Sequence, residues 1–226
     1  MMKLYIVSTP IGNLKDITLR AIETLKDVDF ILCEDTRTSG NLLNHFEIRK
    51  ELISLNAFNE KNKIDFIVNR ILSNQTAALI SDAGTPLISD PGVRLVSSCI
   101  KNGIEIIPIP GASALVAALS MSGLPTDSFV FEGFIPLKKG RQTKLKELAE
   151  EKRTIVLYES TYRIEKLLNE LNEFLPDRFV VVCREITKKF EETWRGFPKD
   201  LIEVLPNKTT KGEFVVVIAP KQWRVI

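Results

Sequence analysis

The feature that most constrains this fold is the alternation of short apolar segments with amphipathic segments in the first half of the 226-residue chain. The apolar segments have the length and composition of strands, and the amphipathic ones have helical spacing. Five such repeats predict a mainly parallel α/β sheet covered on both faces. The predicted strands are residues 3–10, 30–35, 51–56, 76–82 and 105–110, and the predicted helices are 18–27, 38–47, 63–73, 91–103 and 111–123.

The second half has more strands per helix, which indicates a mixed sheet. A segment with Gly, Pro and small polar residues, Ser122–Ser128, separates the halves and is typical of a linker. We therefore predict two α/β domains, at residues 1–121 and 128–226. The predicted strands of the second domain are residues 129–134, 153–160, 178–185, 193–197 and 213–220, and the helices are 141–151, 162–175 and 198–205.

Composition excludes several classes of protein. The chain is 44% hydrophobic and 27% charged, which is typical of a globular protein. No apolar run approaches the roughly 18 residues of a membrane span, and the N-terminal segment does not resemble a signal peptide. Three widely spaced cysteines without a CxxC motif indicate reduced, buried thiols, so we expect a cytoplasmic protein.

The single histidine, His45, argues against metal and triad chemistry. A His–His metal site or a Ser–His–Asp triad has only this one candidate, and it lies in a predicted helix. We expect His45 to be solvated or to cap the helix, and we expect no metal site.

Charge is balanced overall but uneven along the chain. The formal net charge is +2, so there is no global signal for a polyanionic partner. Basic residues gather in Leu137–Arg153 and again in Asn207–Glu213. Taken alone, these segments are most simply a solvated helix face and a turn.

Unusual loops follow four of the five predicted strands of the first half. They read STPIGNLKD, CEDTRTS, SDAGTPLISDPG and IPGASA, and they follow the first, second, fourth and fifth strands. Each alone could be a structural turn. Because the carboxyl ends of parallel strands share one edge, where such sheets bind ligands, their coincidence predicts a binding cleft.

The loops also restrict the ligand. The chain has neither GxGxxG nor GxxxxGK[ST], the motifs that hold dinucleotides and nucleoside triphosphates. Loops with small residues, few cations and exposed backbone amides suit a nucleoside without a phosphate chain. S-adenosylmethionine fits this description, among other ligands.

Eight motifs in order carry a family resemblance. They are TPIGNLKDIT, ILCEDTR, LISDAGTPLISDPG, PIPGASA, FEGFIP, YES with Arg163 shortly after, REITKKFEE and KGEFVVV. Together they closely resemble the tetrapyrrole-methylase superfamily, and within it the bacterial enzymes that methylate a cytidine 2′-hydroxyl of small-subunit ribosomal RNA. The resemblance covers nearly the whole chain and leaves only the C-terminal WRVI unassigned.

The resemblance implies two α/β domains of the tetrapyrrole-methylase type, with S-adenosylmethionine in the cleft between them, and a homodimer. Relatives that methylate tetrapyrroles carry a GGDP-type loop where this chain has DAGTP. Thr85 then replaces the Asp of that loop, which argues for the ribosomal RNA branch. The implied cofactor-binding residues are Pro10, Ile11, Asp82, Gly84, Thr85, Pro86, Ile88, Ser113, Ala114 and Tyr158.

The function implied is methyl transfer to a cytidine ribose in small-subunit ribosomal RNA, either naked or in the assembled subunit. A general base would assist by taking the hydroxyl proton, and cations would hold the RNA backbone. The catalytic candidates are Glu34, Asp35, Glu159, Glu185 and Lys188. The RNA-binding candidates are Arg37, Lys138, Lys139, Arg141, Arg184, Lys208 and Lys211.

Alternatives remain open at the level of residues and of function. Glu34–Arg37 and Arg184–Glu185 are equally interpretable as structural ion pairs, and Tyr158 and Phe134 as core aromatics. Two alternative functions also remain open. The protein could be a methylase of tetrapyrroles or other small molecules, or a nonenzymatic RNA- or nucleotide-binding module.

Overall fold

The structure is a computed structural model that describes residues 2–224. Packing divides the chain into two compact units, Met1–Ser113 and Ala114–Ile226. The sequence predicts that the first domain ends at residue 121. The two boundaries differ by α5 (Ala114–Ser122), which packs against a strand of the second unit. The last two residues of the WRVI segment lie outside the described part of the chain.

The first unit is a five-stranded sheet in the order β3-β2-β4-β1-β5, and every strand pair is parallel. The predicted parallel sheet is therefore confirmed. The strands are β1 (Lys3–Val7), β2 (Phe30–Cys33), β3 (Glu51–Ser54), β4 (Ala77–Leu79) and β5 (Glu105–Ile109), and the helices are η1 (Leu14–Asp16), α1 (Leu19–Asp27), α2 (Thr36–His45), α3 (Glu60–Leu72) and α4 (Val93–Lys101).

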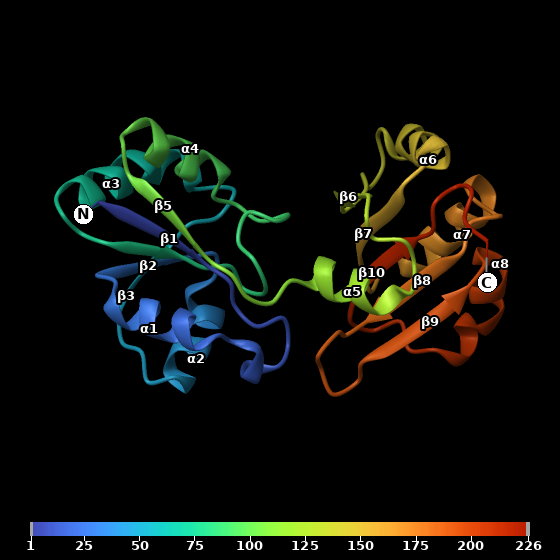
Figure 1. Cartoon of the computed structure of the whole chain (residues 1–226), viewed down its shortest axis with the longest axis horizontal. Coiled ribbons are helices and arrows are strands. Elements are labelled where there is room, and N and C mark those ends of the chain that lie inside the picture. The colour runs from blue at the N-terminus through green and yellow to red at the C-terminus, as the bar shows by residue number, and fades with distance from the viewer. Residues whose placement is uncertain (1, 225–226) are drawn as a thin grey trace. The chain divides into compact units, whose positions relative to one another are not determined.

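Helices cover both faces of this sheet. Because successive side chains of a strand point to opposite faces, each strand contributes residues to a cluster on either side. In β2, Phe30 and Leu32 join the hydrophobic cluster beneath α3 and α4, while Ile31 and Cys33 join the cluster beneath α1 and α2. Figure 1 shows these helix pairs on the two faces of the sheet. A strand covered on both sides is apolar throughout, which is why it reads as a continuous hydrophobic run.

Two helix starts differ from the sequence prediction. The helix expected at residues 38–47 begins at Thr36, because the side chain of Asp35 caps it by accepting from Arg37 N at 2.8 Å. The helix expected at residues 91–103 begins at Val93. Gly92 occupies the N-cap position with φ 120°, so Pro91 lies outside the first turn.

The second unit has a mixed five-stranded sheet in the order β6-β7-β10-β8-β9, as the sequence predicts. Only β6 and β7 run parallel, and the other neighbours are antiparallel. The strands are β6 (Phe129–Gly133), β7 (Thr154–Ser160), β8 (Val180–Arg184), β9 (Glu192–Gly196) and β10 (Glu213–Ile218), and the further helices are α6 (Arg141–Glu150), α7 (Ile164–Phe174), α8 (Pro198–Val204) and η2 (Leu205–Asn207).

One hydrophobic cluster joins this sheet to α6, α7 and α8. Figure 1 shows these helices beside the sheet. Alternate residues of the central strands enter it, including Leu157 and Val216, while Val156 and Val217 are buried outside it. α5 packs against β10, and its buried residues Ala118 and Leu119 also lie outside the cluster.

Candidate functional site

The four loops singled out in the sequence meet at the carboxyl edge of the first sheet. They follow β1, β2, β4 and β5, which run in the same direction. The expectation that they share one edge is confirmed. In such sheets the carboxyl edge is where ligands bind.

Hydroxyl groups join three of these loops. The Thr85 hydroxyl donates to the carbonyl oxygen of Ala112 at 3.1 Å, and its oxygen lies 3.0 Å from the Ser8 Oγ atom. Because the Thr85 proton is used on Ala112, Ser8 is the donor of the second bond. The loops after β1, β4 and β5 are therefore connected through one side chain. The predicted cofactor residues Ser113 and Ala114 follow directly, as the end of the first unit and the start of α5.

Gly84 stands where two of the loops touch. Its backbone forms a bridge with Thr9, with N–O distances of 2.8 and 3.1 Å. Its φ of 82° is in the left-handed region, and a Cβ atom would lie 3.2 Å from Ile11 Cγ2. Glycine is required here both for the backbone conformation and for the close approach of the loops. Two other predicted cofactor residues in these loops, Pro10 and Pro86, are also buried.

The segment after Pro86 has an unusual backbone. Leu87 and Ser89 adopt positive φ angles of 74° and 67°, which non-glycine residues seldom do. Ile88 between them is 38% exposed. Strained conformations of this kind persist where the surrounding structure holds them, and they cluster at ligand-binding segments.

Carboxylates gather along the same edge. The backbone nitrogen of Asp35 donates to Asp82 Oδ1 at 3.2 Å. Asp35 also forms a two-point ion pair with Arg37, which holds the pKa of Asp35 at about 2. The sequence left open a structural ion pair between Glu34 and Arg37. In the structure Arg37 pairs with Asp35 instead. Burial raises the pKa of Glu34, and the charges of Asp82 and Asp35 raise it further.

Asp90 is a candidate that the sequence analysis missed. Burial raises its pKa to about 6, and the charges of Glu34 and Asp82 add to the effect, while a hydrogen bond with Ser81 opposes it. A carboxyl that titrates near neutrality at a ligand-binding edge is a candidate acid or base. The sequence feature that could have identified it is its position between Ser89 and Pro91, in one of the four unusual loops.

The raised pKa of Asp90 predicts a pH-dependent change in stability. Its ordinary value is 3.8, so the folded state favours the protonated carboxyl. The stabilising contribution is complete below about pH 3.8 and is lost as the pH rises through about 6. Asp90→Asn stays neutral, so its urea-unfolding midpoint relative to the wild type is expected to rise between about pH 4.5 and 7.5. Asp65→Asn, at an exposed site on α3, is the matched variant for loss of one carboxylate. A pH-independent difference between Asp90→Asn and the wild type would contradict the assignment.

The second-unit motifs also meet at one end of their sheet. Register pairs Ser160 of β7 with Glu213 of β10, and Arg184 of β8 with both Phe214 of β10 and Glu192 of β9. β6 runs parallel to β7 and ends at the same side. The motifs FEGFIP, YES, REITK and KGE therefore lie along a single sheet end.

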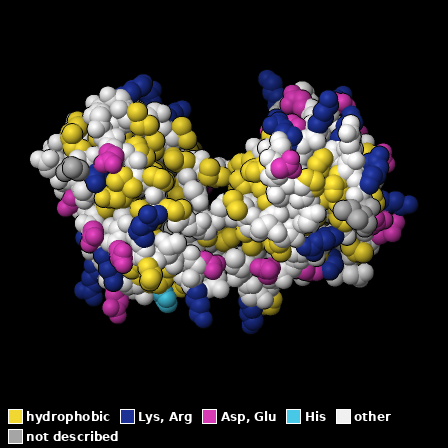
Figure 2. Space-filling model, viewed as in Figure 1, with side chains coloured by type: hydrophobic (Ala, Val, Ile, Leu, Met, Phe, Trp, Pro, Cys, Tyr) yellow, Lys and Arg dark blue, Asp and Glu magenta, His cyan; other side chains and the backbone are white. Residues whose placement is uncertain are grey.

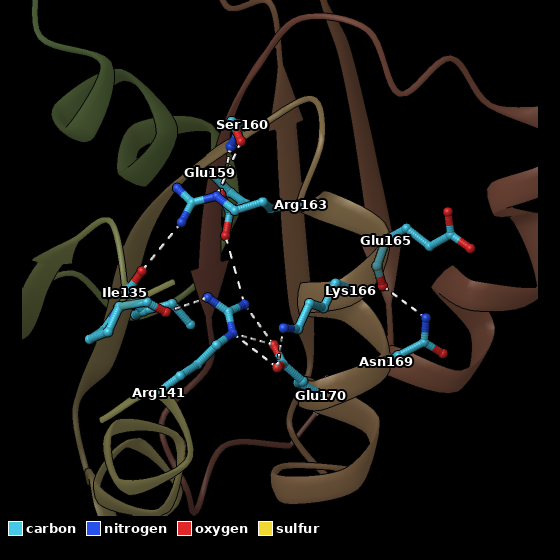
Figure 3. A network of polar contacts seen from close by, with 10 residues as sticks. Ile135, Arg141, Glu159, Ser160, Arg163, Glu165, Lys166, Asn169 and Glu170 are labelled. Atoms are coloured by element: carbon cyan, nitrogen blue, oxygen red, sulfur yellow. Dashed lines mark hydrogen bonds and ion pairs between the residues drawn. The ribbon is translucent and has the colours of Figure 1, made fainter. Parts of the chain in front are cut away.

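Glu159 is the most buried charge at this end, with no exposed side-chain surface. Its Oε1 atom lies 2.7 Å from Arg163 Nε and also accepts from the backbone nitrogen of Ser160 at 2.7 Å. Its Oε2 atom has no hydrogen-bond partner among the described residues and lies 4.0 Å from Arg141 Nη2. Figure 3 shows Glu159 between the two guanidinium groups. This carboxylate is enclosed by protein, so the geometry favours a structural role over that of a base.

Arg141 is buried, contrary to its predicted contact with RNA. Its side chain is 4% exposed, and it donates to Glu170 from Nε at 2.8 Å and from Nη2 at 2.6 Å. Nη1 donates to the carbonyl oxygen of Pro136 at 2.9 Å. As Figure 3 shows, the guanidinium points inward from α6 to α7. The basic run therefore includes an internal ion pair, and Arg141 is not available to a phosphate in this structure.

Arg184 and its neighbours are likewise engaged within the unit. Arg184 is 7% exposed and donates to the carbonyl oxygens of Lys211 and Phe190 at 2.7 and 2.9 Å, rather than to Glu185. Lys188 instead pairs with Glu185 at 2.9 Å. Burial raises the pKa of Glu185, but the hydrogen bond from the Glu213 backbone and the contact with Lys188 outweigh it and lower the pKa. The structure thus brings the catalytic candidates Glu185 and Lys188 together as a pair that tethers a loop.

The remaining candidates differ in exposure. Lys138, Lys139 and Lys211 are exposed, whereas Lys208 pairs with Glu192. Tyr158 is half-buried and packs edge-on against two phenylalanine rings of β6 and its following turn, with ring centroids at 4.9 and 5.8 Å. Figure 2 shows basic and acidic side chains interspersed on the face in view. The three exposed lysines remain candidates for contact with a phosphate backbone.

The described residues offer neither a cluster of metal ligands nor a membrane-spanning helix. Within residues 2–224, no three His, Cys, Asp or Glu side chains form a group that could hold a metal ion. In the same range no helix is long and apolar enough to cross a membrane. His45 is exposed at the end of α2 and packs edge-on against Phe46.

This pairing of a parallel and a mixed sheet, with a glycine-bearing loop at the first carboxyl edge, defines a known class of methylases. The chain belongs to the tetrapyrrole methylase family, since residues 3–202 match the family model for Tetrapyrrole (Corrin/Porphyrin) Methylases. Its relatives include the ribosomal RNA small subunit methyltransferase I of Synechocystis sp., 50% identical and covering 96% of this chain and 78% of that protein. The protein of the same name from Thermotoga maritima is 46% identical, over 98% of this chain and 100% of that protein. The family predicted from the eight motifs is confirmed.

Solved structures agree on the fold. The uroporphyrin-III C-methyltransferase of Thermus thermophilus, complexed with S-adenyl homocysteine, has a TM-score of 0.67 at 16% identity. The similarity covers 96% of this chain and 97% of that one. The predicted tetrapyrrole-methylase architecture is thus confirmed.

Proposed function

We propose that this chain transfers a methyl group from S-adenosylmethionine to the 2′-hydroxyl of a cytidine ribose in small-subunit ribosomal RNA. The observation that carries the proposal is the identity of 46–50% to ribosomal RNA small subunit methyltransferases I over nearly the whole chain. The loop edge of the first unit supplies a site suited to the cofactor.

The residues at this edge fit S-adenosylmethionine. Gly84 lets the loops after β1 and β4 approach each other closely, with its backbone N–H and C=O bonded to Thr9 and its Cα beside Ile11. A carboxylate at such an edge can accept from ribose hydroxyls, as in dinucleotide-binding folds. The surrounding acids also favour a positive charge such as a sulfonium. Asp82 is exposed there, next to Glu34 and Asp90.

The bound cofactor supplies an activated methyl group, and the chain's residues orient the acceptor and handle its proton. In the transfer, the ribose oxygen would form its bond to the methyl carbon, and the sulfur would leave with the electron pair of the carbon–sulfur bond. The hydroxyl proton passes to a base. Glu34 and Asp90 are the best-placed candidates, because each has a raised pKa at the cofactor edge. Glu159 is a poorer candidate because its side chain is fully buried.

The substrate proposal favours RNA over a tetrapyrrole. Thr85 stands where tetrapyrrole methylases carry an aspartate, and its hydroxyl is used to connect loops. The fold similarity to a uroporphyrin methyltransferase lies at 16% identity, whereas the ribosomal RNA relatives lie near 50%.

We also propose that the enzyme acts as a homodimer in the cytoplasm, on ribosomal RNA or on the assembled small subunit. The three cysteines are free and buried, which suits a reducing compartment. Sedimentation of the purified chain tests the dimer, and a single monomeric species at micromolar concentration would exclude it.

Methyl transfer tests the function directly. The chain is incubated with S-adenosylmethionine labelled on the methyl group and with small ribosomal subunits that lack ribose methylation. Label should enter RNA at one cytidine, survive alkaline hydrolysis as a 2′-O-methyl dinucleotide, and be absent when unlabelled S-adenosylhomocysteine is in excess.

Two outcomes would overturn this function. Labelling of a precorrin-like substrate, and not of ribosomal subunits or their RNA, would indicate a small-molecule methylase. Binding of S-adenosylmethionine and RNA without transfer would indicate a nonenzymatic binding module.

A further inference from the structure

Three aromatic side chains are exposed at the motif-bearing end of the second sheet. Phe134 follows β6, Tyr162 follows β7 and Phe190 follows β8, and they are 52%, 95% and 64% exposed. The guanidinium of Arg163 lies 5.6 Å from the Phe134 ring centroid, which places a cation over that ring. Exposed rings gathered at one sheet end indicate a contact surface.

The turns that carry Tyr162 and Phe190 are joined by side-chain hydrogen bonds to backbone groups. The Thr161 hydroxyl lies 2.7 Å from Gly212 O and 2.8 Å from Gly212 N. On the other side, Arg184 donates to the carbonyl oxygens of Lys211 and Phe190. These bonds connect the two aromatic turns through the Lys211–Gly212 turn. The turns that carry the two rings are therefore held together by hydrogen bonds.

Two cations accompany the rings. Lys189 is exposed and its ammonium lies 5.4 Å from the Phe190 ring centroid. Lys211 is exposed on the joining turn. Among the described residues, neither ammonium lies within ion-pair distance of a carboxylate. Both remain open to a phosphate.

The carboxylates nearby are already engaged. Lys188 bonds Glu185 at 2.9 Å and Glu213 at 2.8 Å. Glu191 accepts from the backbone nitrogen of Thr187 at 2.6 Å. These acidic groups thus each have a partner at this end. Glu191 and Glu213 are nevertheless exposed, so the surface carries paired carboxylates together with the rings and the two unpaired cations.

We propose that Tyr162, Phe190, Lys189 and Lys211 form a platform for single-stranded RNA, here called the stacking surface. Unpaired bases stack on the two rings, and the lysines contact phosphates. Aromatic rings interleaved with cations are the usual means of holding unpaired strands, whereas duplex RNA hides its bases from such rings. This inference rests on the proposed function, and it specifies that the substrate region is presented as an unpaired strand.

Direct binding tests the stacking surface. The probe is a fluorescein-labelled RNA of about 12 nucleotides with alternating cytidine and adenosine, alone or paired with its complement. Tyr162→Ala and Phe190→Ala should each weaken binding of the single strand by about 5- to 150-fold, the range for loss of one base stack. Binding of the duplex should stay unchanged. Tyr162→Phe and Phe190→Tyr keep the rings and should bind the single strand like the wild type.

A matched control comes from the first unit. Phe66 of α3 is 54% exposed, so Phe66→Ala removes an accessible ring outside the stacking surface and should leave RNA affinity unchanged. Lys189→Gln and Lys211→Gln should each reduce the slope of log affinity against log salt by about 0.7, the value for one lost phosphate contact on a single strand.

Three outcomes would overturn the stacking surface. The first is unchanged single-strand affinity in Tyr162→Ala and Phe190→Ala. The second is an equal loss for the duplex, which would mean that the rings do not read unpaired bases. The third is a change in sedimentation with unchanged RNA affinity, which would make this surface a contact between copies of the chain.

The experiments distinguish a wrong assignment of the stacking surface from a wrong proposed function. Ribose methylation of small subunits by the wild type, with full RNA binding and methylation by both alanine variants, would remove the stacking surface and leave the function intact. Conversely, a wild type that transfers no methyl group would remove the function, while the oligonucleotide affinities would still test the surface.

Discussion

Arg141→Ala is expected to lower the free energy of unfolding of the second unit by about 3–5 kcal/mol, the usual cost of removing one partner of a buried ion pair. The guanidinium is 4% exposed and makes a two-point contact with Glu170. Without it, Glu170 loses its inward partner, and Glu159 loses the cation that lies 4.0 Å from its Oε2 atom, which has no hydrogen-bond partner among the described residues. The turn at Pro136 also loses a hydrogen bond.

Tryptophan fluorescence during urea unfolding measures this effect, because both tryptophans, Trp194 and Trp223, lie in the second unit. Lys139→Ala is the matched control, since it removes an exposed cation two residues away and should change the free energy of unfolding by less than about 0.5 kcal/mol. Arg141→Lys should fall between the two, because it retains the charge and loses the planar fork. Equal stability of Arg141→Ala and Lys139→Ala would show that Arg141 is not a structural ion-pair partner.

Gly84→Ala is expected to weaken S-adenosylmethionine binding at least about tenfold, which corresponds to about 1.4 kcal/mol. The new Cβ would stand 3.2 Å from Ile11 Cγ2, on a residue with φ 82°. The loops bridged by Thr9 and Gly84 must then separate, and the hydroxyl contacts of the neighbouring Thr85 shift with them. The left-handed conformation adds a stability cost of about 1–2 kcal/mol.

Gly103→Ala separates cofactor binding from backbone strain. Gly103 lies in the same unit with φ 72°, and a Cβ there meets nothing within 4 Å. Gly103→Ala should therefore lose only the stability cost of the left-handed conformation, and Gly84→Ala should lose at least as much by urea unfolding. Only Gly84→Ala should lose affinity in calorimetric titration with S-adenosylmethionine. Equal affinities in the two variants would exclude the Gly84 loop from the cofactor site.

The strands of the first sheet were predictable because burial on both faces makes them apolar throughout, as in β2 and β4. Their direction followed from the helices between them, so the edge that carries Thr85 was predictable as well. The starts of α2 and α4 were less accurate. They depend on the capping side chain of Asp35 and on the positive φ of Gly92, which are local backbone choices.

Side-chain roles within the site were harder to predict than its position. Thr85 was identified from its motif, but its hydroxyl acts by joining Ser8 to Ala112, which lie 77 and 27 residues away along the chain. Asp90 was missed because its raised pKa depends on burial and on Glu34. Neither dependence leaves a pattern within the local sequence.

The sequence by itself determined the family, the two sheet types and the loop edge, because strand and helix periodicities and motif order are local properties of the chain. Only the tertiary structure decided which charges face outward. Arg141 lies in a basic run that reads as a solvated surface, yet it pairs with a carboxylate 29 residues away. Lys211, equally basic in sequence, stays exposed. Burial of a charge requires a partner brought by the fold, because an unpaired charge is too costly to remove from water.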